Sequence, residues 1–95
     1  MKISIKQDAD SADLTIACRL VDSNDPQVQL QPGEWVEVGD CVPGTHALRV
    51  GVILPAGSAW ATLSLSGATF NGETSIKDLF MGPTDGGRYE LEVAP

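Results

Sequence analysis

The residues best suited to recognition chemistry lie in one short segment, in which three carboxylates surround a tryptophan. Glu34, Glu37 and Asp40 supply negative charge, and the alternation of the segment predicts that Trp35 points outward beside Glu37. An exposed aromatic side chain is typical of the anchor of a protein interface. Carboxylates beside it attract a basic partner and set its orientation. The segment therefore predicts a partner-binding face.

Two neighbouring segments extend this set. Asp22 and Asp25 belong to the turn that precedes the acidic segment, and Arg49 belongs to the long apolar stretch that follows it. If both strands turn their valine and leucine side chains to the core, one allowed register places Trp35 opposite Arg49. A guanidinium against an exposed indole contributes about 0.5–1 kcal/mol. We therefore include Asp22, Asp25 and Arg49 among the candidate partner-binding residues.

Catalytic residues are much harder to find. Cys41 and His46 lie near each other in the sequence, and His46 is the only histidine. A Cys–His pair needs a third group to orient the base, and neither that group nor a G-x-S-x-G motif is present. We predict that the protein is not an enzyme.

Metal and cofactor sites are also not predicted. Cys18, Cys41 and His46 are one ligand short of a tetrahedral zinc site. The acidic turns at 8–13 and 22–25 offer oxygen ligands, but neither matches the D-x-[DN]-x-[DN]-G calcium loop, and Asp and Asn are common in turns. A calcium site in these turns, or a carbohydrate stacked on Trp35 or Trp60, is kept as an alternative.

The charge of the chain restricts its partners. Thirteen acidic and six basic residues give a net charge of −7 and a pI near 4.3. Phosphate backbones and anionic lipids repel such a chain, and its basic residues are scattered singly along the sequence. The first residues lack the apolar segment of a signal peptide, and no apolar run is long enough to span a bilayer. We therefore expect a cytoplasmic protein that binds neither nucleic acid nor membranes directly.

The elements that position these residues read as β-strands. Two Pro-Gly turns, at 32–33 and 43–44, are each followed by alternating apolar residues, the pattern of a half-buried strand. Asn71-Gly72 is a two-residue hairpin signal, and the segment Ser75–Met81 fits either a strand or one helical turn. The predicted strands are 2–6, 14–21, 28–30, 34–38, 45–54, 60–66, 68–70 with 73–76, and 88–93. This pattern predicts a single all-β domain over residues 1–95, a small antiparallel sandwich (immunoglobulin-like or barrel-like) of seven or eight short strands.

The two cysteines are predicted to be reduced. Cys18 alternates with aliphatic residues and is expected to be buried and slow to react, whereas Cys41 is expected in an accessible loop. A bridge between them, joining the two sheets, is the alternative.

Three functional hypotheses follow. The first is a non-enzymatic acidic module that docks on a basic protein and inhibits it, as small nuclease-immunity and phage anti-defence proteins do by imitating nucleic-acid phosphates. The second is an assembly subunit, for example of a virion, that forms homo-oligomers through exposed strand edges. The third is a sandwich that binds calcium or carbohydrate.

Overall fold

The computed structural model describes residues 1–11, 15–21, 26–54, 59–81 and 86–95; the side chains at 11, 52–54, 59–60, 78–81 and 86 are not described. The described chain forms eight strands and one short 3-10 turn at Ala9–Ser11. The strands are β1 (Lys2–Gln7), β2 (Thr15–Leu20), β3 (Val28–Gln29), β4 (Trp35–Asp40), β5 (Gly44–Leu54), β6 (Ala59–Ser66), β7 (Ser75–Met81) and β8 (Gly86–Val93).

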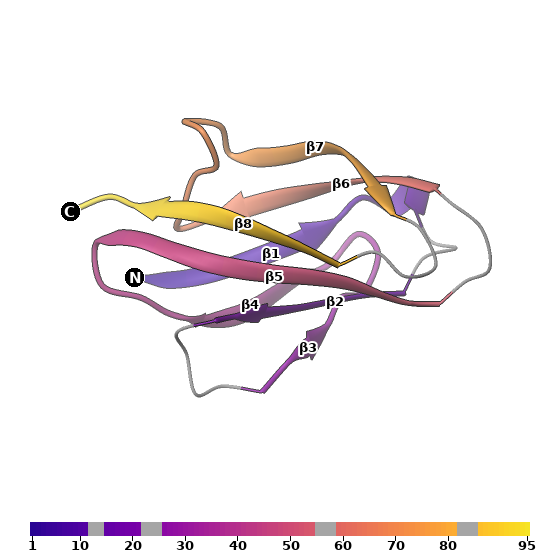
Figure 1. Cartoon of the computed structure of the whole chain (residues 1–95), viewed down its shortest axis with the longest axis horizontal. Helices are drawn as coiled ribbons and strands as arrows, with labels where there is room; N and C mark the ends of the chain where they lie inside the picture. Colours follow the sequence, from indigo (N-terminus) through magenta and orange to yellow (C-terminus); the bar gives the residue numbers. More distant parts are fainter. Residues whose placement is uncertain (12–14, 22–25, 55–58, 82–85) are drawn as a thin grey trace.

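These strands form two antiparallel four-stranded sheets packed face to face (Figure 1). One sheet has the order β4-β1-β6-β7 and the other the order β3-β2-β5-β8. The predicted all-β sandwich is therefore confirmed, with eight strands. The described part of the chain contains no helix of the length and hydrophobicity that crossing a bilayer requires.

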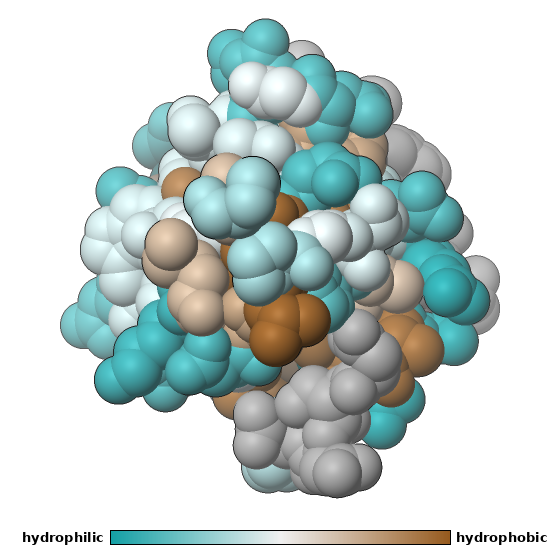
Figure 2. Space-filling view, turned by 90° about the vertical axis from the view of Figure 1, so that its left-hand side faces the viewer, coloured by the Kyte–Doolittle hydropathy of each residue, from teal (hydrophilic) through white to brown (hydrophobic). Residues whose placement is uncertain are grey.

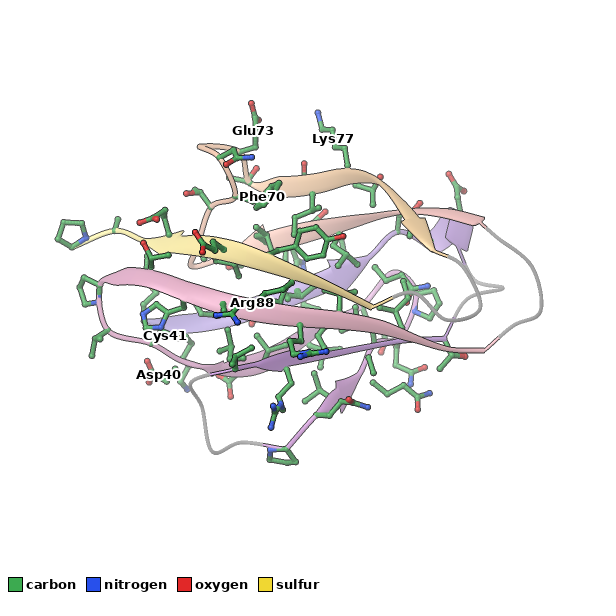
Figure 3. The ribbon with its side chains drawn as sticks, viewed as in Figure 1. Asp40, Cys41, Phe70, Glu73, Lys77 and Arg88 are labelled. Carbon is green, nitrogen blue, oxygen red and sulfur yellow. The ribbon has the colours of Figure 1, made fainter. Side chains whose placement is uncertain are left out.

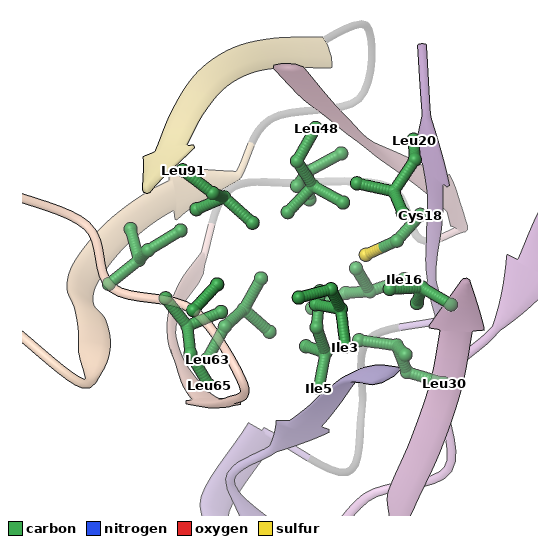
Figure 4. Packing of buried hydrophobic residues seen from close by; sticks show 14 of the residues in the cluster. Ile3, Ile5, Ile16, Cys18, Leu20, Leu30, Leu48, Leu63, Leu65 and Leu91 are labelled. Atoms are coloured by element: carbon green, nitrogen blue, oxygen red, sulfur yellow. The ribbon is translucent and has the colours of Figure 1, made fainter. Parts of the chain in front are cut away.

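The core fills the space between the two sheets with aliphatic side chains. One sheet contributes Ile3, Ile5, Leu63 and Leu65, and the other contributes Ile16, Cys18, Leu20, Leu48 and Leu91 (Figure 4). Each of these side chains is at most 5 % exposed. Successive residues of a strand point to opposite faces, so alternation in the sequence becomes burial on one side of each sheet. The predicted inward faces of β1, β2, β4, β6 and β8 are confirmed, as is that of β5 at Leu48 and Val50.

The predicted pairing of the acidic segment with the following strand is wrong. β4 and β5 lie in different sheets, and the connection at 41–43 carries the chain from one sheet to the other. Trp35 is opposite Lys6 of β1, while Arg49 is opposite Arg19 and Arg88. Periodicity shows which face a strand buries, and a Pro-Gly turn shows that the chain changes direction. Neither identifies the strand with which it pairs.

The Asn71-Gly72 hairpin turn is confirmed. Both residues have positive φ, 51° and 81°, as a type I′ turn requires, and Phe70 and Glu73 exchange both backbone hydrogen bonds across it. The following segment, Ser75–Met81, is strand β7 and not a helical turn. Its Ile76 is buried opposite Leu63, and this burial favours the extended form.

Both cysteines are thiols rather than members of a disulfide, and both are buried. The burial of Cys18 was predicted. Cys41, which was expected in an accessible loop, is instead 7 % exposed and packs in the core cluster. The loop that it begins crosses between the sheets, and such a crossing places its first residue over the open end of the core.

Candidate functional site

Trp35 is a large apolar side chain left half exposed, at 50 %, on the edge strand β4. Lys6 lies opposite it in the β1–β4 ladder and places its Nζ 5.1 Å from the centre of the indole ring. This is a cation–π contact, which restrains the ring without removing it from solvent. The predicted outward orientation of Trp35 is confirmed.

The carboxylates beside Trp35 are paired with cations of the first strand. Lys2 places its Nζ 3.9 Å from the Oε1 of Glu37. The amino group of Met1 donates a hydrogen bond of 2.8 Å to the Oδ1 of Asp40 and one of 2.9 Å to the carbonyl of Cys41. This ammonium, through its hydrogen bond and its charge, lowers the pKa of Asp40 below the ordinary value.

The side chains of Lys2, Lys6, Trp35, Glu37 and Asp40 thus form one outward surface of the β1–β4 pair, here called the Trp35 face. This surface holds the carboxylates of Glu37 and Asp40 and three cationic groups, counting the amino terminus, and Glu34 is exposed in the turn before β4. The face is therefore of mixed charge. The acidic face predicted from the sequence lacked the cations because nothing in the sequence showed that the first strand pairs with the fourth.

The remaining candidates are not brought to this face. Asp22 and Asp25 lie outside the described residues. Arg49 is exposed on the outer surface of the other sheet, away from Trp35.

Arg49 instead belongs to a cross-strand row of arginines. Arg19 of β2 and Arg88 of β8 lie directly opposite it on its two sides, and all three are exposed. We call Arg19, Arg49 and Arg88 the arginine row; Figure 3 looks onto the sheet that carries it and labels Arg88. Within the described part of the chain, none of the three forms an ion pair. The sequence analysis missed this row because its members are some thirty to forty positions apart in the chain.

A third feature lies at the end of the sandwich near both termini. A pocket of about 470 Å³ is lined by apolar groups of Met1, Leu65, Ala68, Val93 and Pro95, among others. Figure 2 looks onto this end of the molecule and shows apolar side chains interspersed with polar ones. Glu92 and two threonines are the polar lining residues, so the pocket offers few groups to orient a ligand.

Catalytic and metal chemistry find no further support. His46 places its Nε2 2.7 Å from the carbonyl oxygen of Val42, within its own turn. Asp8 accepts a hydrogen bond from the backbone N–H of Thr62, a structural role. The described residues contain no group of three His, Cys, Asp or Glu side chains that could hold a metal ion. Asp13, Asn24 and the side chain of Trp60, on which the calcium and carbohydrate alternatives also rest, lie outside the described part.

Comparisons with family models, with curated proteins and with solved structures found no match to this chain.

Proposed function

We propose that the protein is a non-enzymatic binding module that docks a protein partner on the Trp35 face. The half-exposed indole of Trp35, restrained by Lys6 on an edge strand, is the observation that carries this proposal. Interface anchors combine a large aromatic side chain with little conformational freedom, and they are surrounded by polar groups that exclude water on binding. The ion pairs beside Trp35 supply such a rim.

The mixture of charges on the Trp35 face indicates the charge of the partner surface more closely than the net charge of the whole chain does. A partner with an apolar pocket and a rim of both signs would pair with Lys2 and Lys6 as well as with Glu37 and Asp40. A purely basic partner, as in the inhibitor hypothesis, would have to displace these cations. An exposed pair such as Lys2–Glu37 contributes only about 0–1 kcal/mol, so displacement is feasible but reduces the gain from each carboxylate. The geometry thus favours a mixed-charge partner.

The proposal is tested by quantitative capture of partners from a lysate of the source cells. The bait is the wild-type protein, Trp35→Ala, or the matched control Val42→Ala. Val42 is also an exposed apolar residue, at 72 %, but lies roughly 20 Å from Trp35 along the strand direction. We expect Trp35→Ala to weaken capture of a specific partner about 30-fold, as loss of an anchor does. Val42→Ala should leave the capture unchanged.

Two controls make the result interpretable. Unfolding of each variant is measured in parallel, and Trp35→Ala should cost only roughly 1–2 kcal/mol because half of the side chain is exposed. A folded Trp35→Ala that retains full capture would refute the proposal. Capture that falls steeply with salt would instead indicate the purely basic partner, and a stable oligomer in light scattering would favour the assembly hypothesis.

A further inference from the structure

The arginine row gathers three of the six basic residues of a strongly acidic chain on one surface. We propose that this row binds a short linear polyanion of the phosphate class, an oligophosphate. This site is separate from the Trp35 face, because the two lie on the outer surfaces of different sheets. Evidence for or against this site therefore does not bear on the proposed function.

The contacts of the described residues do not account for the row. Like charges directly opposite each other on neighbouring strands destabilise a sheet. Arg49 has such a neighbour on each side, and the described residues provide no carboxylate in ion-pair contact with any of the three. An anion bound across the row would offset this repulsion, because each arginine would be attracted to it.

The geometry fits a linear ligand that lies across the strands. Directly opposite residues have Cβ atoms about 5 Å apart, so the row spans roughly 10 Å. Next to it, two positions along each strand, lies a second row of small residues, Ala17, Gly51 and Gly86. Ala17 is 4 % exposed and so is covered by neighbouring atoms, while Gly51 is partly exposed and carries no side chain. The arginine row is thus bordered on this side by residues with short side chains or none.

The chemistry of guanidinium favours phosphate oxygens. Its planar fork donates two parallel hydrogen bonds to an oxyanion, and Arg is the preferred residue for this bidentate contact. An acidic peptide added as a strand would run along the sheet and present its carboxylates about 7 Å apart in that direction. The arginine row runs perpendicular to it, so a peptide strand matches poorly.

The ligand must also be short. Glu90 and Glu92 lie on the same surface as the arginine row, opposite Ala47 and Thr45, and the whole chain carries −7. Charges act strongly only within about 8–10 Å at physiological salt. An anion no longer than the row experiences mainly the arginines, whereas a nucleic acid extends over the acidic remainder of the surface and is repelled.

The test is calorimetric titration with tripolyphosphate, with orthophosphate as the single-group control at matched ionic strength. We expect tripolyphosphate to bind more tightly than orthophosphate, and Arg49→Gln to weaken its binding about tenfold or more, the loss expected for a charged hydrogen-bonding group. Arg49→Lys should also weaken binding, because an ammonium cannot form the bidentate contact. The matched control Lys77→Gln removes an exposed cation from β7 of the other sheet and should leave binding unchanged.

Amide chemical shifts locate the ligand, and changes should be confined to the strands that carry the arginine row. No saturable binding of tripolyphosphate, or equal weakening by Lys77→Gln, would overturn the proposal. Tighter binding of a single-stranded oligonucleotide or of a hexaglutamate peptide at the same residues would also overturn it, in favour of a nucleic acid or an acidic protein segment. Because Trp35→Ala leaves this site intact, it should bind tripolyphosphate like the wild type.

Discussion

Removing the charge at the centre of the arginine row should make the protein more stable. Most surface substitutions change stability by less than about 0.5 kcal/mol in either direction, so a gain is a distinctive result. Arg49 is the informative position because it has a like charge on both sides. The substitution is Arg49→Gln, which keeps part of the aliphatic stem and a polar end.

The size of the gain follows from the register. Two unit charges about 5 Å apart repel by about 0.8 kcal/mol in water, and Arg49 has two such neighbours. Glu90 lies diagonally across at about 7 Å and attracts Arg49 by about 0.6 kcal/mol. The net gain for Arg49→Gln is therefore about 1 kcal/mol at low salt and about 0.6 kcal/mol at physiological ionic strength. These are upper values, since guanidinium groups can splay apart.

The assay is urea unfolding followed by circular dichroism. Arg49→Gln should raise the midpoint, with a rise in melting temperature of roughly 5 °C for a domain of this size. Arg19→Gln, which removes one repulsion, should give a smaller gain. Arg88→Gln should be nearly neutral, because Arg88 also loses the attraction of Glu90 two residues along its strand. Arg49→Lys retains the charge and is the matched control, with no gain expected.

Salt supplies the decisive comparison. The difference between Arg49→Gln and the wild type should shrink as the ionic strength rises from about 10 mM to about 1 M, since screening removes the repulsion. A variant that is no more stable than the wild type at low salt, or whose difference is independent of salt, would show that the three guanidinium groups do not act on one another. The register that places them side by side would then be in doubt.

Three further predictions concern glycines and thiols. Gly67→Ala should destabilise the protein by several kcal/mol, because φ is +87° and an added Cβ would clash with a carbonyl oxygen of β1. Gly72→Ala has a similar φ of +81° but open space around the added Cβ, so it should cost only about 1 kcal/mol in the same unfolding assay. Burial raises the pKa of the Cys18 thiol from 9.0 to about 12, so the unfolded chain loses this proton at a lower pH than the folded protein does. The free energy of unfolding should therefore fall by about 1 kcal/mol between pH 9 and pH 10. The free energy of unfolding of Cys18→Ala should fall by less over the same interval. Thiol titration of the native protein at neutral pH should find Cys41 as slow as Cys18, and prompt reaction at Cys41 would contradict its burial.

The sequence predicts the fold class and the inward face of each strand, because burial in a sandwich imposes a period of two on the residues. Ile3 and Ile5, or Leu48 and Val50, show this directly. The sequence does not predict which strands pair with each other. Strands close in sequence often pair as hairpins, but here β1 lies between β4 and β6. The pairing is decided by how all eight strands close the core together, and no local pattern records that.

The residues that surround Trp35 were predicted only in part, again because the sequence does not show which strands pair. Trp35 points outward as its alternation requires, but the cations that surround it come from a strand some thirty residues earlier. The arginine row shows the dependence on strand pairing even more clearly. Each arginine alone is an ordinary outward residue of a strand, and only the register makes three of them neighbours. A residue's own face is a local property, whereas the composition of a surface depends on the topology.

The central position of β1 has a consequence for synthesis. Ser4 pairs with Ser66 on one side and with Glu37 on the other. A chain emerging from the ribosome therefore carries Ile3 and Ile5 without their native neighbours until most of the sequence has been made. Closing so long a loop is slow, and unpaired apolar strands are prone to aggregate in the interval. We expect the domain to fold only after its later strands have been made, and to benefit from a chaperone that holds its first strand until then.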